Sequence, residues 1–401
     1  MNPAPTQAAA PSSVSLRRCL VAELEQLGAL RSTPVRDAFL SVPRELFLRE
    51  LAERDGLDAV HRNELVVTKT DATGFPLSSS SEPQVMAAML ERLDLHEGMR
   101  VLEIGTGTGY NAALMKAIVG RRGRIVTVEL DREVAQKARA ALRAAAYPVR
   151  VVCADGHLGF AAAAPYDRIV LTAGSATITR EWLDQLVEGG LLELPLRMKA
   201  VGPQAIATFR RTGRRLESVS VVPGQFMHLR RSDAPTTRAP SLPVKQVLGN
   251  GESSFVHLSG KSLERLSTAG WRRLLALGEP RTRPVGVRFP AWSLALYLAL
   301  EIPESLLVTR WEDLAVGVLD PAGRGIAFVE GRWQGGHRPT PLRILAYGDP
   351  AAEERLDAVL REWSERGRPG LDRLRIEAVF RNGTPRISHA WAAAAAAAAP
   401  M

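Results

Sequence analysis

Three glycines at alternate positions, Gly105, Gly107 and Gly109, are the residues of this sequence best suited to hold a small ligand. They follow an apolar run at 100–104 that is typical of a buried strand, and a helical pattern begins at Tyr110. Glycine allows a sharp backbone turn and lets a ligand approach where any Cβ atom would collide. The spacing differs from the G-x-G-x-x-G of nicotinamide-binding folds, and it lacks the Lys-Ser/Thr pair of a phosphate loop.

The segment from Glu103 to Gly109, E-x-G-x-G-x-G, resembles the first motif of the class I S-adenosylmethionine-dependent methyltransferases. The methionine end of this cofactor carries an ammonium group, which the Glu103 carboxylate can balance directly or through water. Glu129 ends the next expected strand, where an acidic side chain can accept both ribose hydroxyls. Asp155, after the third strand, is placed to reach the adenine amino group. Alternatively, Glu103 and Glu129 are ordinary helix-capping or surface carboxylates. The predicted cofactor-binding residues are Glu103, Gly105, Thr106, Gly107, Thr108, Gly109, Glu129, Leu130, Asp155, Gly156 and His157.

Further stretches resemble the protein-L-isoaspartate O-methyltransferase family. They are 42–47, 80–86, 164–173 and 185–195, and they occur in the family's order and at matching spacing. The resemblance covers about residues 16–225. It implies an α/β fold with a Rossmann-like, doubly wound sheet, S-adenosylmethionine as cofactor, and a peptide or protein substrate that carries an aspartyl or isoaspartyl carboxylate.

The sequence departs from this family on the acceptor side. The family's Ile-Ser-Gln-Pro stretch reads Ser80-Ser81-Glu82-Pro83, the preceding loop lacks a Leu-Pro-Ile-Gly segment, and a second domain follows. These departures resemble the branch that accompanies ribosomally made, modified peptides such as lanthipeptides and graspetides. We therefore predict methylation of a specific aspartate in a cyclised precursor peptide. Isoaspartyl methylation in protein repair is the alternative.

The chemistry expected of the acceptor needs no general base, because a carboxyl group with a pKa near ~3.9 is ionised at neutral pH. The enzyme must align the reacting atoms and exclude water. Ser81 matches the family's acceptor-site serine and is the predicted catalytic residue, with a plain helix N-cap as the alternative. Ser79, Ser80, Glu82 and Thr172 are predicted to bind substrate, although an anion at Glu82 would repel an acidic acceptor. The methyl ester can then close to a succinimide and open to isoaspartate without an enzyme residue. No metal site is expected.

The elements that must position these residues alternate between strands and helices, a pattern that builds a parallel sheet covered on both faces. Strands are predicted over 100–104, 124–129, 149–153, 166–172 and 190–195, and helices over 16–30, 33–40, 82–93, 110–119, 133–145 and 179–187. The segment 64–81 is predicted to be a loop. A hairpin is expected over 205–210 and 216–222, with its turn at Gly213.

Proline-rich and low-complexity segments suggest the domain limits. They give a disordered leader at 1–13, a methyltransferase domain at 14–230, a linker at 231–243, an α+β accessory domain at 244–391 and an alanine-rich tail at 392–401. In the accessory domain, helices are predicted near 262–276, 292–300 and 351–366, and strands over 285–289, 314–319, 325–330, 342–347 and 373–380. This domain is expected to bind an extended peptide by strand addition, to cover the cofactor site or to form a dimer.

The composition of the 401 residues, 46% hydrophobic and 24% charged, is that of a globular protein and excludes a disordered chain. The net charge of +9 lies in the second half, and residues 201–300 carry 15 basic against 5 acidic residues. This bias suits an acidic precursor peptide or a solvated surface. Two cysteines and the lack of a signal peptide or spanning segment predict a cytoplasmic protein without membrane association. Aromatic residues, at 5%, are too few for a nucleic-acid stacking platform, so no nucleic acid partner is expected.

Overall fold

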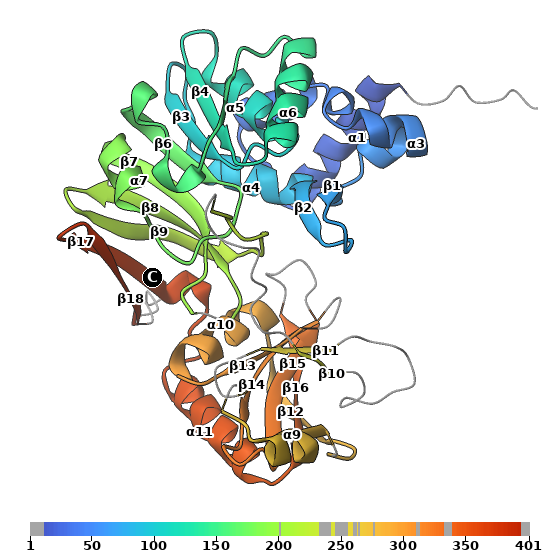
Figure 1. The fold of residues 1–401 in the computed structure, drawn as a ribbon, viewed down its shortest axis with the longest axis vertical. Helices are drawn as coiled ribbons and strands as arrows, with labels where there is room; N and C mark the ends of the chain where they lie inside the picture. Colours follow the sequence, from blue (N-terminus) through green and yellow to red (C-terminus); the bar gives the residue numbers. More distant parts are fainter. Residues whose placement is uncertain are drawn as a thin grey trace, which may run out of the picture. The chain divides into compact units, whose positions relative to one another are not determined.

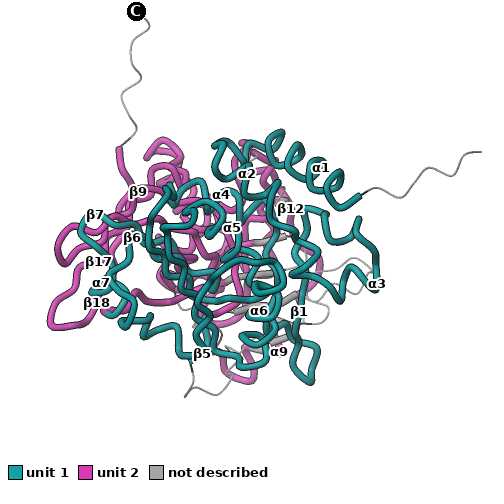
Figure 2. The backbone as a smooth tube through the Cα atoms, turned by 90° about the horizontal axis from the view of Figure 1, so that it is seen from above, with its two compact units in different colours: residues 1–173, 181–193, 229–232 teal, residues 174–180, 194–228, 233–401 magenta. Residues whose placement is uncertain are grey.

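The computed structural model describes residues 12–199, 202–231, 242–244, 256–259, 263, 265–275, 277–309, 313–332 and 339–393. The chain divides into two compact units (Figure 2), the first made of 1–173, 181–193 and 229–232, the second of 174–180, 194–228 and 233–401. The domain limits at 14–230 and 244–391 stay predictions. Most of the predicted leader, linker and tail lies outside the described residues.

The first unit begins with three helices, α1 (Ser13–Gln26), α2 (Thr33–Ser41) and α3 (Arg49–Val60). The first two lie where the apolar spacing predicts them. Between α2 and α3, a short 3₁₀ turn, η1 (Arg44–Leu46), follows Pro43. The sequence analysis missed α3, whose regular pattern is interrupted by Gly56 at φ +84°.

A parallel sheet with the strand order β7-β6-β3-β4-β5 forms the centre of the first unit. Its strands are β3 (Arg100–Ile104), β4 (Arg124–Glu129), β5 (Arg150–Cys153), β6 (Tyr166–Leu171) and β7 (Leu186–Leu196). The helices between them are α5 (Tyr110–Val119), α6 (Arg132–Ala144) and α7 (Arg180–Gln185), preceded by α4 (Pro83–Leu93) (Figure 1). The alternation that the sequence predicted is confirmed, and the fold is that of the class I methyltransferases.

The prediction of a loop over 64–81 is wrong, because this segment forms an antiparallel hairpin of β1 (Val66–Thr70) and β2 (Pro76–Ser80). Four of the five β1 residues are β-branched, which favours an extended strand. The turn is closed by Asp71, whose Oδ1 accepts the backbone N–H groups of Thr73 at 2.8 Å and Phe75 at 2.9 Å. The serines are therefore held in a strand.

Ser81 is not the N-cap of the following helix. The N-cap of α4 is Glu82, which makes no side-chain capping bond, and Pro83 is the first helical residue. Proline fits there because its missing N–H would have no partner in the first turn anyway. Ser81 thus lies one residue before the cap, between β2 and α4.

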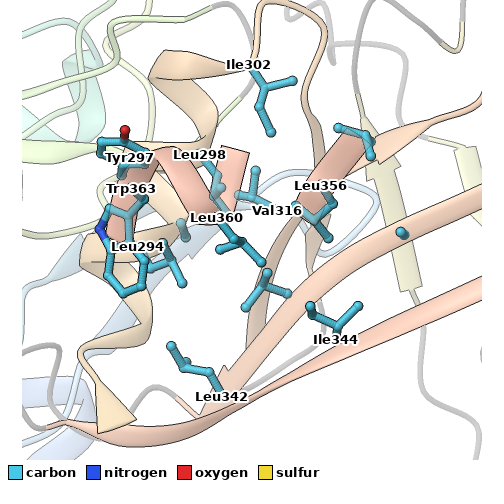
Figure 3. Packing of buried hydrophobic residues seen from close by; sticks show 14 of the residues in the cluster. Leu294, Tyr297, Leu298, Ile302, Val316, Leu342, Ile344, Leu356, Leu360 and Trp363 are labelled. Atoms are coloured by element: carbon cyan, nitrogen blue, oxygen red, sulfur yellow. The ribbon is translucent and has the colours of Figure 1, made fainter. Parts of the chain in front are cut away.

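The second unit contains an antiparallel sheet with the order β10-β11-β13-β14-β15-β16-β12. Its strands are β10 (Leu242–Val244), β11 (Val256–Ser259), β12 (Arg281–Phe289), β13 (Leu306–Thr309), β14 (Asp313–Leu319), β15 (Gly325–Arg332) and β16 (Thr340–Gly348). Helices α10 (Ala291–Glu301) and α11 (Ala351–Glu365) pack against this sheet, and Figure 3 shows Leu298, Leu356 and Val316 in their shared core. A shorter helix is α9 (Thr268–Leu275). The predicted α+β character is confirmed.

Four more strands of the second unit form an antiparallel series, β18-β17-β9-β8. They are β8 (Ala205–Thr212), β9 (Arg215–Pro223), β17 (Leu374–Arg381) and β18 (Thr384–Trp391). The predicted hairpin at 205–222 is confirmed, with Gly213 at φ +57° in its turn. β18 was missed.

Candidate active site

The glycine loop follows β3 and is tightly packed on both sides. Gly105 has φ +95°, and a Cβ atom added there would lie 2.6 Å from Thr172 Oγ1. Gly107 has φ +52°, and its Cβ would lie 2.9 Å from the carbonyl oxygen of Ser79. No side chain fits at these positions without displacing a neighbour. The loop is therefore in contact with two residues that the sequence assigns to the substrate, Ser79 and Thr172.

Hydrogen bonds inside the loop fix its path into α5. Thr172 Oγ1 donates to the carbonyl oxygen of Gly105 at 2.6 Å. Thr108 Oγ1 accepts the N–H of Tyr110 at 3.3 Å. Gly109, at φ +86°, is the N-cap of α5, where a Cβ would lie 3.2 Å from Leu142 Cγ. Thr172 thus shapes the loop as well as facing it.

Glu103, on β3, is fully buried. Its Oε1 accepts a hydrogen bond from Asn111 Nδ2 at 2.8 Å, and its Oε2 accepts one from Thr127 Oγ1 at 2.6 Å. Burial raises the pKa of Glu103 to about 7, although both hydrogen bonds favour the ionised form. Thr106 Oγ1 extends the network to Thr127 Oγ1 at 2.8 Å. A cation close to this carboxyl group would favour its ionised form.

Glu129, at the end of β4, lies against the glycine loop. Its Oε2 accepts the N–H groups of Thr106 at 3.1 Å and Gly107 at 3.2 Å, while its Oε1 accepts that of Asp131 at 3.1 Å. The next residue, Leu130, begins the turn into α6, and its carbonyl oxygen accepts Cys153 Sγ at 3.8 Å. Contact of Glu129 and Leu130 with a ribose stays a prediction.

The segment after β5 is held in place by α7. Asp155 Oδ1 accepts the backbone N–H of His157 at 2.9 Å. The same oxygen is hydrogen-bonded to the ring atom Nδ1 of His157 at 2.8 Å. The His157 ring stacks on Trp182, with 6.2 Å between centroids. Trp182 Nε1 donates to the carbonyl oxygen of Gly156 at 2.9 Å. These contacts make a fixed wall after β5, and its binding of adenine stays a prediction.

The serine segment contains a buried hydroxyl group that the sequence could not single out. Ser80 Oγ is inaccessible and, among the described residues, has no hydrogen-bond partner. Ser78 Oγ, by contrast, accepts Thr68 Oγ1 at 3.1 Å. Ser81 is partly exposed. Burial, with a smaller contribution from Glu23, raises the pKa of Glu82.

Lys69 ties the β1–β2 hairpin to the turn beyond Glu129, and the sequence analysis missed it. Its Nζ lies 2.8 Å from Asp131 Oδ2 and 2.7 Å from Glu133 Oε2. Asp131 is also the N-cap of α6, accepting the N–H groups of Glu133 and Val134. One lysine therefore joins the serine hairpin to the helix that begins beside the predicted ribose carboxylate.

Arg44, which the sequence analysis did not single out, packs against Tyr110, the first residue of α5. It is fully buried, and its guanidinium lies 5.7 Å from the ring centroid of Tyr110. Phe39 and Phe47 contact the same ring, at 6.2 Å and 5.6 Å between centroids. Arg44 belongs to the stretch 42–47 that carried the family resemblance, which was the available signal.

A cavity of about 480 Å³ lies beside the loop, between α3, β1 and α6, and Gly107 and Thr108 form part of its wall. In the part of the chain that the structure describes, no group of three or more His, Cys, Asp or Glu side chains is arranged to hold a metal ion. No helix among the described residues has the length and apolar character needed to span a bilayer.

Residues 15–230 match the family described as protein-L-isoaspartate(D-aspartate) O-methyltransferase. A protein-L-isoaspartate O-methyltransferase of Thermotoga maritima is 38% identical over 181 residues, which are 45% of this chain and 56% of that protein. One from Hyperthermus butylicus is 36% identical over 245 residues, 56% of this chain and 94% of that protein.

A solved structure of a protein-L-isoaspartate O-methyltransferase is similar to this chain, with a TM-score of 0.53 and 26% identity. The match covers 93% of this chain and 99% of that chain. It therefore extends well beyond residues 15–230 and into the second unit. A second unit of this kind does not distinguish the present chain from isoaspartate methyltransferases.

Proposed function

This chain belongs to the protein-L-isoaspartate(D-aspartate) O-methyltransferase family, and from this premise we propose that it methylates the free carboxylate of isoaspartyl residues in proteins or peptides. The observation that carries the proposal is the packing of Ser79 on Gly107. It puts the segment that the family resemblance assigns to the acceptor directly over the loop that the cofactor motif identifies. Donor and acceptor can meet only where two such segments adjoin.

The residues around the glycine loop suit S-adenosylmethionine. Gly105 and Gly107 let the loop turn sharply after β3 while Thr172 and Ser79 pack directly against it. Glu129 ends β4 and Asp155 follows the neighbouring strand β5, so their carboxylates are candidates to bind the ribose and the adenine amino group. Glu103 can balance the methionine ammonium directly or through water. When bound, this cofactor supplies a methyl group on a positively charged sulfur.

The chain's own residues then have to align a carboxylate and keep water away. An isoaspartyl carboxylate is already ionised at neutral pH, so no residue needs to remove a proton from it. The hydroxyl group of Ser81, which is partly exposed, can donate a hydrogen bond to its oxygens, whereas Ser80 Oγ is buried and has no partner among the described residues. Lys69 ties the β1–β2 hairpin to the start of α6, and a bound substrate beside this hairpin would help to keep water away from the reacting atoms.

A more specific hypothesis is methylation of an aspartate in a cyclised precursor peptide. It depends on the departures at residues 80–83 and on the presence of a second domain. The presence of a second domain does not favour this hypothesis, because an isoaspartate methyltransferase of known structure matches 93% of this chain. The relatives also favour the isoaspartyl substrate, since those described above share the isoaspartate name.

The test uses the full chain, S-adenosylmethionine and two synthetic peptides of one sequence, which contain either isoaspartate or aspartate at a single position. A cyclised aspartyl peptide is the third substrate. Mass spectrometry follows the gain of one methyl group, and mild alkali tests whether the product is an ester. We expect methylation of the isoaspartyl peptide alone.

Methylation of only the cyclised aspartyl peptide would contradict the proposed isoaspartyl substrate and support the precursor-peptide hypothesis. Absence of methylation on all three, with S-adenosylhomocysteine binding intact in calorimetry, would contradict both carboxylate proposals while leaving the cofactor site in place.

A further inference from the structure

The cavity beside the glycine loop runs along an open strand edge. All five residues of β1, Val66–Thr70, line it. No residue of the paired strand β2 lines it. The cavity therefore lies along the side of β1 that faces away from β2. Among the described strands, β1 pairs with β2 alone, so this edge offers backbone N–H and C=O groups.

The charged residues around this cavity largely neutralise one another. Lys69 is paired with Asp131 and Glu133, and Lys137 with Glu50 at 2.9 Å. Arg54 forms an ion pair with Asp55 at 2.8 Å. A ligand is therefore not selected here by a strong net charge.

The remaining walls are mostly apolar and come from three elements. Phe47 and Leu48 precede α3, Val66 lies on β1, and Val134, Ala140 and Ala141 lie on α6. The volume, about 480 Å³, is within the range of ligand pockets and admits side chains of a peptide. Val67, an exposed apolar residue of β1, also lines the cavity. Backbone groups beside apolar space are what an extended peptide requires.

We propose that the substrate polypeptide next to the isoaspartyl residue binds as a third strand on the free edge of β1, with its side chains in the cavity between α3 and α6. The proposal rests on the proposed function and adds how the substrate is held. The cavity wall includes Gly107 and Thr108, so a peptide bound there leads directly to the glycine loop. Recognition through the backbone makes methylation tolerant of the sequence around the isoaspartyl residue.

The first experiment uses the wild-type chain and isoaspartyl peptides with a single N-methyl group at each of four successive amides. All four amides lie on the same side of the isoaspartyl residue. The isoaspartyl linkage adds one carbon to the peptide backbone, so the alternation of amide directions does not continue from one side of that residue to the other. In a strand, only alternate amides face a given neighbour. We expect N-methylation at every second amide to lower kcat/KM about tenfold, which is the effect of about one lost hydrogen bond. N-methylation at the intervening amides should change kcat/KM by less than about twofold.

The second experiment fills the cavity from α6. Ala140 lines the cavity and is exposed, so Ala140→Phe adds bulk there without entering the core. Ala144 is exposed on the same helix and does not line the cavity, so Ala144→Phe is the matched control. Ala140→Phe should raise the KM for an eight-residue isoaspartyl peptide about tenfold, whereas the KM for S-adenosylmethionine should stay the same in both variants.

Three results overturn the inference while the proposed function survives. They are an N-methyl series without alternation, equal peptide KM values for the two phenylalanine variants, and a rise in the KM for S-adenosylmethionine in Ala140→Phe. If the wild-type chain methylates none of the isoaspartyl peptides, the proposed function fails, and this inference fails with it.

Discussion

The glycine loop of the first unit and the two helices α10 and α11 of the second unit differ in the kind of residue that is buried next to them. Around the loop, Glu103, Thr106 and Thr127 are buried polar groups joined by hydrogen bonds. Under α10 and α11, the buried cluster consists almost wholly of apolar side chains such as Leu298, Leu356 and Ile344 (Figure 3).

The difference separates residues that serve a ligand from residues that serve stability. Burying a carboxyl group costs free energy, and apolar residues of similar size would fill the same space without that cost. A protein that keeps the Glu103 carboxyl group buried on β3 is therefore expected to gain function rather than stability from it. Leu356 needs no such explanation, because its burial removes apolar surface from water. Four predictions test this contrast.

The largest effect is expected for Leu356→Ala in the apolar cluster. It removes a fully buried side chain and should destabilise the second unit by about 4 kcal/mol. The affinity for S-adenosylhomocysteine should not change. Peptide-resolved hydrogen exchange measures the first effect and calorimetry the second, and Leu356→Met is the volume-conserving control. A loss of S-adenosylhomocysteine affinity in Leu356→Ala at a temperature where the protein remains folded would contradict the view that Leu356 serves stability alone.

The next effect concerns the pH dependence of stability. The pKa of Glu103 is raised from 4.5 to about 7, so between these values the folded chain holds a proton that the unfolded chain has lost. The free energy of unfolding should therefore fall by about 3 kcal/mol from this site as pH rises through that window, and stay lowered above it.

Glu103→Gln should remove this pH-dependent decrease, because a neutral amide does not titrate. Denaturation of both proteins at pH 5 and pH 8 provides the measurement. In the wild type, binding of S-adenosylhomocysteine near pH 7 should also release a proton, detectable by calorimetry in two buffers of different ionisation enthalpy. Equal pH dependence in the two proteins would show that Glu103 is ionised throughout.

A third prediction compares two glycines of similar conformation. Gly107→Ala and Gly213→Ala both place alanine at a positive φ, +52° and +57°, but only the first meets another atom, Ser79 O at 2.9 Å. Gly107→Ala should lower kcat/KM about a hundredfold, or about 2.7 kcal/mol, while Gly213→Ala should cost only local stability. Similar activity in both variants would mean that the close packing of Ser79 on Gly107 is not required.

The smallest effect is expected at the serines. Ser80→Ala removes a buried hydroxyl group without a partner among the described residues, so the free energy of unfolding should rise by about 1 kcal/mol. Ser78→Ala removes the acceptor of the Thr68 hydroxyl group and should lower the free energy of unfolding by a similar amount. The KM for the isoaspartyl peptide should stay the same in both variants and rise in Ser81→Ala, because only the Ser81 side chain is partly exposed. A raised peptide KM in Ser80→Ala, with an unchanged one in Ser81→Ala, would assign the acceptor contact to Ser80 instead.

Much of the first unit could be predicted from the sequence. The strands at 100–104 and 124–129 and the helix at 110–119 have the predicted limits, because buried strands and amphipathic helices leave regular apolar patterns. The hairpin at 66–80 was missed because Gly, Pro and four serines are typical of loops. Its pairing depends on β1 and on the turn closed by Asp71.

Local patterns along the chain were sufficient to predict the alternation of strands and helices, the place of the glycine loop and the family, because each of these is encoded in residues close together. The folded chain was needed to show that Ser79 packs on Gly107, that Lys69 reaches Asp131, that Glu103 is buried enough for a raised pKa, and that β1 leaves an edge open. These features join segments up to tens of residues apart. Their distances follow from how helices and strands pack, which local patterns do not specify.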